Sequence, residues 1–221
     1  MALVGIGQVP EDGQRITKTE AIKLQWEMIQ EWKPRREVFS LIYGPGILGA
    51  MSAVSGFMLN HHYRKKLKLG SYGHLSSYFP LVIMPAALSA FFHRTIVSTS
   101  IVIGETKCVI CTEVGAVALQ TGLGVLYPLV MAPSACYMLA NRYNTVKVPN
   151  IITHGKKAYW DFHMVTSRSF YRKVPYIILV QAVCAAVVTY FDFKNYFCLN
   201  NKIIEIEKKM IADGEHANMM L

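Results

Sequence analysis

Cys108 and Cys111 are the two side chains best spaced in this sequence to act together chemically. A CxxC pair is typical of half a zinc ribbon or of a thioredoxin-type redox site. No second pair of ligands accompanies it and no alternating strand and helix pattern surrounds it, so we interpret it as a structural disulfide or two free thiols. An odd total of five cysteines also excludes a disulfide scaffold. The sequence therefore predicts no metal site and disfavours a catalytic redox role.

The histidines and carboxylates form no recognisable catalytic or cofactor-binding pattern. The sequence contains no HExxH, Walker, GxSxG or kinase motif. Bis-histidine haem requires two facing ligands, and only His93 among the seven histidines lies near an apolar stretch. Glu113, at an edge, is the one acidic residue of the predicted spans, which disfavours a proton or cation carrier because carriers need buried ionisable groups. We expect a protein that is not an enzyme and binds no cofactor.

The elements that carry these side chains are predicted to be membrane-spanning helices, because uncharged apolar stretches alternate with short basic segments. Residues 114–140 hold no charge and exceed the roughly 20 residues that a helix needs to cross the hydrocarbon core. A buried helix of a soluble protein is the alternative, but the rest of the chain repeats the pattern, with 52% hydrophobic and 17% charged residues. We predict an all-α, polytopic membrane protein with four transmembrane helices at about 38–59, 76–97, 114–140 and 174–191.

Two amphipathic helices are predicted outside the spans. Residues 17–32 gather apolar side chains on one face, and Thr17 with Glu20 fits a capping box at the start of that helix. This face would lie on the membrane surface, on a partner or on the bundle itself. Aromatic side chains within the connection 141–173 suit an interfacial helix before the fourth span.

The domain organisation follows from these elements. Residues 1–16 are predicted to be a flexible lead that resembles neither a signal peptide nor an Arg-rich presequence. A short helix is expected at 201–211, with a disordered segment beyond it. The predicted parts are therefore an N-terminal lead with its amphipathic helix at 1–37, a four-span membrane domain at 38–191 and a polar C-terminal tail at 192–221.

Small residues four apart occur in every predicted span, and they are the candidate packing or partner faces. In lipid, such pairs let two helix backbones approach closely. Packing within the bundle could use all of them, or one could dock a partner. The pairs are Gly49 with Ala53, Ala86 with Ala90, Ala118 with Gly122, and Ala182 with Ala186.

The positive charge indicates an orientation rather than nucleic-acid binding. The chain has a formal net charge of +9, and its basic residues cluster beside the spans, where lipid headgroups and topology explain them. The connections 60–75 and 141–173 hold four and seven Lys/Arg, against five near the span ends on the other side. The positive-inside rule predicts these two connections on the cytoplasm-like side of the membrane.

The segment from Cys108 to Gly155 resembles a known family. It contains CVIC, then GLGVLYPLVMAP, LANRY, a proline at Pro149 and the His154-Gly155-Lys156 triplet, and SFYRKVPYIILVQAV follows. Together with the layout of the first two spans, these features resemble the transmembrane protein 126 family of the mitochondrial inner membrane. The resemblance covers about residues 34–190. Within it, the family-like residues proposed for a packing or partner face are Gly124, Tyr127, Pro128, Arg142 and Tyr143.

The resemblance implies a non-enzymatic assembly factor for mitochondrial respiratory complex I. Its implied partners are complex I membrane-arm subunits and, within the intermediate assembly complex, ECSIT, an acyl-CoA dehydrogenase-like protein and a CIA30-type factor. The spans would hold membrane-arm subunits among the membrane lipids, and the long basic connections would face the matrix. The alternatives are a permanent accessory subunit of a respiratory complex and a small inner-membrane channel or carrier.

Overall fold

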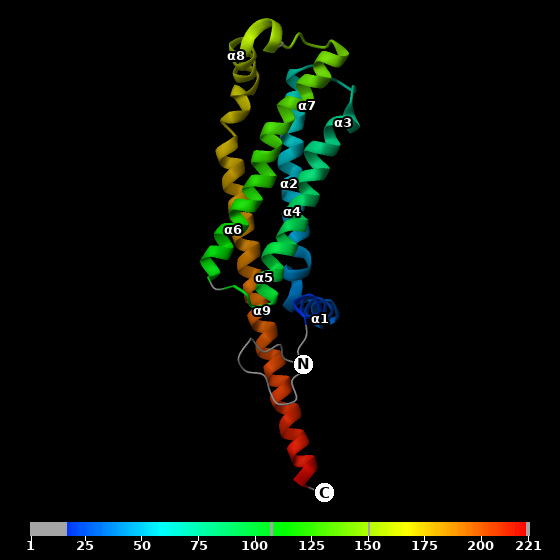
Figure 1. Cartoon of the computed structure of the whole chain (residues 1–221), viewed down its shortest axis with the longest axis vertical. Helices are drawn as coiled ribbons and strands as arrows, with labels where there is room; N and C mark the ends of the chain where they lie inside the picture. Colours follow the sequence, from blue (N-terminus) through cyan, green and yellow to red (C-terminus); the bar gives the residue numbers. More distant parts are fainter. Residues whose placement is uncertain (1–16, 107, 150, 220–221) are drawn as a thin grey trace.

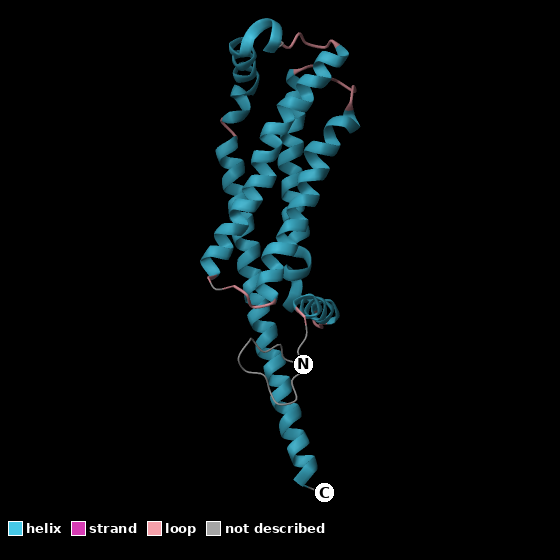
Figure 2. Cartoon of the chain, in the orientation of Figure 1, coloured by secondary structure: helices cyan, strands magenta, loops and turns pink. Residues whose placement is uncertain are grey.

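The computed structural model describes residues 17–106, 108–149 and 151–219, and these residues form helices joined by short connections, with no strand among them (Figure 2). The predicted lead at 1–16 lies outside the described residues. Four helical columns, Arg35–Lys66, His74–Val102, Val109–Tyr143 and Val174–Met210, are long and apolar enough to cross a membrane. The all-α, four-span prediction is confirmed.

The columns stand side by side in an elongated bundle (Figure 1). The first comprises η1 (Arg35–Val38) and α2 (Phe39–Lys66). The second and third are segmented, and the fourth is the single long helix α9 (Val174–Met219). The second column contains α3 (His74–Tyr78), η2 (Phe79–Ile83), α4 (Met84–Phe92), η3 (His93–Ser98) and α5 (Thr99–Val102), and the third contains α6 (Val109–Thr121), η4 (Gly122–Leu126) and α7 (Tyr127–Tyr143).

Proline chemistry explains two of the three π-helical segments, η2 and η4. Pro85 and Pro128 have no N–H to donate and their rings crowd the carbonyls four residues earlier, those of Leu81 and Gly124. A π turn immediately before each proline relieves this conflict without ending the helix. The third segment, η3, has no proline to account for it.

Two further helices lie at opposite ends of the bundle (Figure 1). α1 (Lys18–Glu31) crosses the end where α2 begins, and its capping box is present: the Thr17 backbone N–H donates to Glu20 Oε2 at 2.9 Å. α8 (Ile151–Tyr171) caps the other end, at the place predicted for the interfacial helix, and Gly155 at φ 81° interrupts its helical geometry.

α9 corrects the prediction for the C-terminal region. The fourth span was expected to end near Phe191, with a separate short helix at 201–211, but α9 continues without a break and projects beyond the other helices (Figure 1). The sequence between Pro175 and Gly214 contains neither proline nor glycine, so nothing in it terminates a helix. An ion pair between Lys209 and Glu205 at 2.9 Å, one turn apart, supports the extension.

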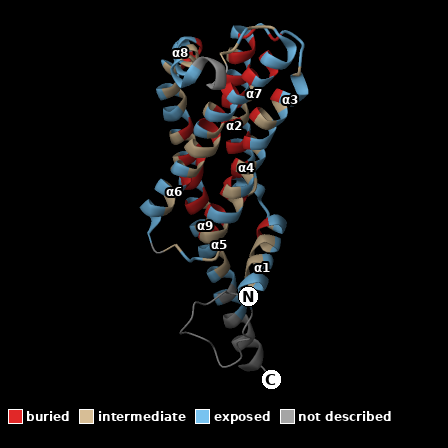
Figure 3. Ribbon diagram, turned by 45° about the horizontal axis from the view of Figure 1, so that its top comes forward, coloured by how far each residue is buried: buried red, intermediate tan, exposed pale blue. Residues whose placement is uncertain are grey.

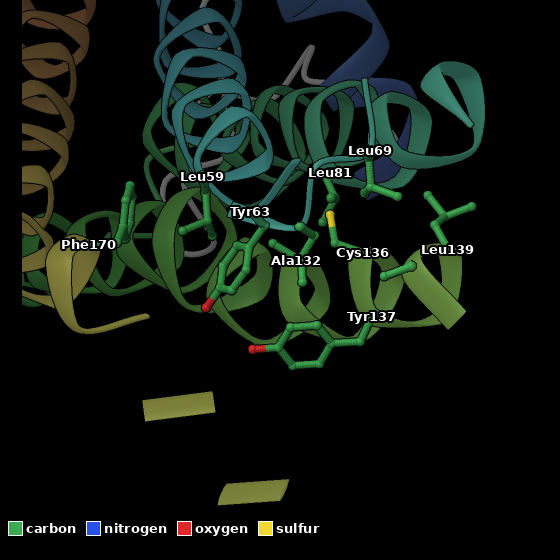
Figure 4. Packing of buried hydrophobic residues seen from close by; sticks show 11 residues of the cluster. Leu59, Tyr63, Leu69, Leu81, Ala132, Cys136, Tyr137, Leu139 and Phe170 are labelled. Carbon is green, nitrogen blue, oxygen red and sulfur yellow. The ribbon is translucent and has the colours of Figure 1, made fainter. Parts of the chain in front are cut away.

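α2 is the central helix of the bundle. Half of the apolar window of its column is buried, against 22% in each of the other three. Buried residues line the column interiors, while the outer faces are exposed (Figure 3). The largest apolar cluster lies toward the α8 end, where Tyr63 and Leu59 of α2 meet Cys136 and Tyr137 of α7 (Figure 4).

Candidate functional site in the bundle interior

Cys108 and Cys111 form a disulfide, with their Cα atoms 5.3 Å apart. Both are exposed at the end of the bundle that carries α1, and Cys108 is the N-cap of α6. Its Sγ accepts a hydrogen bond from the Cys111 backbone N–H at 3.2 Å. The disulfide therefore links the N-cap of α6 to the first turn of the third column, and the two sulfurs are not arranged around a ligand.

Two of the predicted small-residue pairs contact each other. A Cβ added at Gly49 would lie 2.8 Å from the Ala86 carbonyl oxygen and 3.2 Å from Ala90 Cβ, so α2 and α4 approach closely only because residue 49 is glycine. Gly56 is tighter still, since its Cβ would overlap the Leu81 carbonyl. Ala53, the partner of Gly49 in the sequence pattern, is only half-buried.

The third pair, Ala118 with Gly122, does not pack inside the bundle and faces outward. Ala118 is exposed and a Cβ at Gly122 would meet nothing within 4 Å. The buried stripe consists instead of Ala116, Gln120, Gly124 and Pro128. Ala118 and Gly122 lie two residues from Gln120 in each direction, roughly opposite it on a helix, so burying the amide turns them outward.

The remaining candidates divide between the interior and the surface. Ala182 and Ala186 are half-buried beside the inward-facing Gln181 and Ala185. Pro128 is buried, Tyr127 is half-buried, and Arg142 and Tyr143 are exposed at the α8 end. Tyr143 stacks on Tyr72, with ring centroids 4.9 Å apart, and so closes the ends of two columns.

Gln120 is the centre of a buried polar group that we call the glutamine cluster: Gln120, Gln181, Ser52, Ser55 and Ser89. The Gln120 amide donates to Gln181 Oε1 at 2.7 Å, to Ser52 Oγ at 3.0 Å and to the Leu48 carbonyl at 3.0 Å. Its own oxygen accepts from Ser89 Oγ at 2.5 Å. One side chain therefore joins all four columns.

Gln181 and Ser55 complete the cluster. Gln181 Nε2 donates to the Met51 carbonyl at 2.9 Å and to Ser55 Oγ at 3.2 Å. Ser55 Oγ in turn donates to the Gly124 carbonyl, the group that Pro128 cannot serve as a donor. Serine thus supplies from α2 the hydrogen bond that the proline removes from the third column.

A second buried group, the aspartate cluster, comprises Asp192, His93, Ser40 and Ser98. Ser40 Oγ donates to Asp192 Oδ1 at 2.5 Å, Ser98 Oγ donates to Oδ2 at 3.0 Å, and His93 Nε2 lies 3.3 Å from Oδ2. Asp192 and His93 are fully buried. Within the described residues, His93 Nδ1 has no hydrogen-bond partner, so one ring nitrogen of this cluster is buried without a hydrogen bond.

Sequence reasoning missed the aspartate cluster because it assigned Asp192 to the polar tail. The statement that Glu113 is the one acidic residue of the spans is therefore wrong: the fourth column carries a buried carboxylate. The signal was present, since Gln181, Ala185, Val188 and Asp192 recur at intervals of four, three and four, which is one helix face. Groups of three or more His, Cys, Asp or Glu arranged for a metal ion are absent from the described residues.

Comparison with known sequences identifies the family. The profile of the family described as Transmembrane protein 126 matches residues 20–207. The chain belongs to this family. The transmembrane protein 126 of Drosophila melanogaster is 34% identical over 210 residues, which cover 95% of this chain and 93% of that protein.

More distant members of the family agree. Transmembrane protein 126A of Mus musculus is 26% identical over 70% of this chain and 76% of its own length. Its counterpart from Homo sapiens is 26% identical over 73% of this chain and 80% of its own length. No solved structure matches the chain. The match at 20–207 includes the first three columns, α8, most of α1 and α9, and both polar clusters.

The two clusters define what the bundle interior can do. In the hydrocarbon region an unpaired polar group has no water to bind, so a complete network fixes the mutual rotation of the helices that supply it. The glutamine cluster acts in this way at the middle of the bundle. The aspartate cluster joins the start of α2 to η3 and α9, and it adds ionisable groups to the interior.

Proposed function

We propose that the chain is a non-enzymatic membrane scaffold for assembly of the membrane arm of mitochondrial respiratory complex I, acting within the intermediate assembly complex. One observation carries the proposal beyond family membership. The polar groups of the interior bind one another, whereas the outer faces of the columns present large apolar side chains. On α9 these include Tyr176, Leu179 and Tyr190.

Such a division of faces suits a protein that binds other spans. In lipid, hydrophobicity alone does not drive helices together. A scaffold therefore needs rigid surfaces whose shape fits a partner helix. The internal clusters supply the rigidity, and the exposed faces supply the contact area. We propose complex I membrane-arm subunits as the partners of these faces.

The α8 end is the proposed contact for soluble assembly factors. α8 and the turn after it carry five exposed basic side chains, and Trp160 of α8 is 56% exposed. ECSIT, the acyl-CoA dehydrogenase-like protein and the CIA30-type factor are the partners that the family resemblance implies. The basic side chains are Lys156, Lys157, Arg168, Arg172 and Lys173.

The proposed location is the mitochondrial inner membrane, with the α8 end in the matrix. Both basic connections lie at that end of the bundle, and α1 with the Cys108–Cys111 disulfide lies at the other (Figure 1). The positive-inside rule favours the matrix for the basic end, and an oxidised cysteine pair suits the intermembrane space. Protease treatment of mitoplasts tests this orientation, because a C-terminal tag that survives opening of the outer membrane would contradict it.

The scaffold role is tested by removing the protein and by altering an outer face. Complexome profiling of cells without the protein should show stalled complex I intermediates, with the other respiratory complexes unchanged. Gly122→Leu adds a bulky side chain at the start of η4, where it meets no other part of the chain. If the outer face of the third column docks a subunit, this variant should cause the same accumulation of complex I intermediates while the protein level stays normal. Ala182→Leu gives a second comparison on α9. Gly46→Leu on α2 is the matched control, since a Cβ there also meets nothing within 4 Å.

Two outcomes would remove the proposal. Normal complex I in the absence of the protein would contradict the assembly role. Stable presence of the chain in the mature complex would instead make it a permanent accessory subunit.

The aspartate cluster favours one further candidate, a small channel or carrier. Buried ionisable residues within spans are typical of ion pathways, and Asp192 and His93 are such residues. Proton flux into liposomes that contain the purified protein tests this function. Flux that Asp192→Asn abolishes would support the carrier against the scaffold.

A further inference from the structure

A groove of about 770 Å³ lies on the outer surface between α2 and α9. The two helices run antiparallel there, and Gly44 lets them approach: a Cβ on this residue would lie 2.7 Å from Val188 Cγ1. Ser40, Gly44 and Val188 therefore form the floor, and larger side chains form the walls. The groove is open to the surroundings of the bundle and is separate from the glutamine cluster.

The two ends of the groove differ in polarity. Toward the middle of the bundle its walls are Ile47, Val183 and Val187, with exposed fractions of 42%, 53% and 47%. Toward the end that carries α1, the lining changes to Arg36, Glu37, Lys194, Asn195 and Cys198. The groove thus joins an apolar channel to a polar mouth, along the direction in which the spans cross the membrane.

The mouth is positively charged. The Glu37 carboxylate is already paired, since it accepts hydrogen bonds from Lys202 Nζ and, at 3.1 Å, from Trp32 Nε1. Arg36 and Lys194 form no ion pair within the described part of the chain. Lys194 Nζ instead lies 5.8 Å from the centre of the Phe191 ring. Because Lys202 already pairs with Glu37, Arg36 and Lys194 leave the mouth of the groove with a net positive charge.

The dimensions match one leaflet of a bilayer. The lining of α9 runs from Val183 to Cys198, which at 1.5 Å per residue is about 22 Å of helix. Half of a hydrocarbon core is about 15 Å. A lipid chain lying in the apolar part of the groove would therefore bring its headgroup to the cationic mouth.

We infer that this groove binds a phospholipid with an anionic headgroup. One acyl chain lies along Ile47, Val183 and Val187, and the phosphate lies between Arg36 and Lys194. The bound lipid covers the α2–α9 seam next to Ser40, which lines the groove and also donates to Asp192. It therefore shields the aspartate cluster from the membrane side. This site does not depend on the proposed role in complex I assembly.

Lipid retention by the purified full-length protein tests the inference. Native mass spectrometry from detergent, with phosphatidylglycerol or phosphatidylcholine supplied, should show one phosphatidylglycerol retained in preference to phosphatidylcholine. The double change Arg36→Gln and Lys194→Gln should weaken retention of phosphatidylglycerol roughly 25-fold, about fivefold per cation. The matched control, Lys65→Gln with Lys66→Gln, removes two exposed cations at the other end of α2 and should change retention little.

A second pair of variants tests the apolar channel. Val187→Trp fills the groove and should abolish retention while leaving both cations in place. Met138→Trp is its control, because Met138 is 70% exposed on α7 and does not line the groove. Circular dichroism should show the same helical content for all variants.

Three results would overturn the inference. Equal retention of phosphatidylcholine and phosphatidylglycerol would remove the role of the cations. Binding of inorganic phosphate that needs Arg36 and Lys194 but is unchanged by Val187→Trp would identify an anion site without a lipid channel. A dimer that forms through this groove without bound lipid, and that Val187→Trp disrupts, would identify a dimer interface instead.

Discussion

Polar contacts hold this protein together in two regions that differ in their access to water. In the bundle interior, Gln120, Gln181 and Asp192 are at most 1% exposed, and their bonds run between columns. Beneath α8, His163 links Tyr137 of α7 at 3.1 Å to Tyr171 of α8 at 2.7 Å, and both His163 and Tyr171 are only half-buried. Water therefore cannot replace the hydrogen bonds of the bundle interior, but it can replace those beneath α8.

The two regions therefore differ in the energetic cost of losing a hydrogen-bond partner. Removing one partner from a buried hydrogen bond leaves the other unsatisfied at a cost of about 1–3 kcal/mol. At a half-exposed site water takes the vacant position, so the cost is smaller. We therefore expect changes in the interior to disturb the whole bundle, and changes beneath α8 to disturb only the docking of that helix.

The largest effect is expected from Asp192→Leu. Ser40, Ser98 and His93 would lose their shared acceptor, and breaking a buried pair in this way destabilises a protein by about 3–5 kcal/mol. Asp192→Asn retains an oxygen for one serine and should cost only about 1 kcal/mol. Thermal unfolding in detergent, followed by circular dichroism, measures both. Equal stability of the two variants would show that the carboxylate is not the organising group.

Gly124→Leu should have the next largest effect. A Cβ at this position would already lie 2.9 Å from Ser52 Oγ and 3.3 Å from Gln181 Nε2, so the larger side chain must displace the glutamine cluster. Overpacking of this kind costs about 3 kcal/mol. Gly122→Leu, two residues away in open space, should change the stability by no more than about 0.5 kcal/mol. The same unfolding measurement decides, and similar losses in both variants would contradict the assignment of the inward face.

Gln120→Leu tests the cluster through its hydrogen bonds rather than its volume. The change removes four bonds, and at about 0.6 kcal/mol for an average polar contact in a membrane bundle the loss is about 2 kcal/mol. Thr121→Val is the control, since Thr121 Oγ1 donates at 2.8 Å to the Val117 carbonyl of its own helix and joins no other column. A Gln120→Leu protein as stable as the wild type would mean that apolar packing alone fixes the bundle.

Much of this fold was predictable because it depends on local patterns. Apolar length defines the four spans, and the Thr17 and Glu20 pair defines the start of α1. The contact of Gly49 with Ala86 and Ala90 also follows from small residues at helical spacing. What was missed depends on rotation about the helix axis, which small residues alone do not determine.

The two main features that the sequence analysis missed depend on polar side chains that were given too little weight. Gln120 fixes which side of the third column faces inward, and it turns Ala118 and Gly122 outward. Asp192 shows that a carboxylate directly after an apolar stretch can belong to the interior when it continues the inward stripe of its helix. The sequence did not predict where the π turn of η4 would lie. The wider π turn explains how residues at strict intervals of four can stay on one face, as the buried stripe does: Ala116, Gln120, Gly124 and Pro128.

The smallest effect is expected from the pH dependence of α8 docking. Burial lowers the pKa of His163 from its ordinary value of 6.5, so the docked helix favours the neutral imidazole. A histidine with a lowered pKa contributes its full stability above pH 6.5, and that contribution falls as the pH decreases below 6.5 toward the pKa of the docked state. Hydrogen exchange of α8 should therefore increase as the pH falls from 6.5 to 5, after correction for the intrinsic exchange rate. His163→Gln should reduce this dependence, whereas His61→Gln, at an exposed position on α2, should retain it in full. Exchange in α2 should stay constant over the same range, because the contacts beneath α8 are separate from the interior clusters. A pH-dependent loss of protection throughout the bundle would show that the two regions form one cooperative unit.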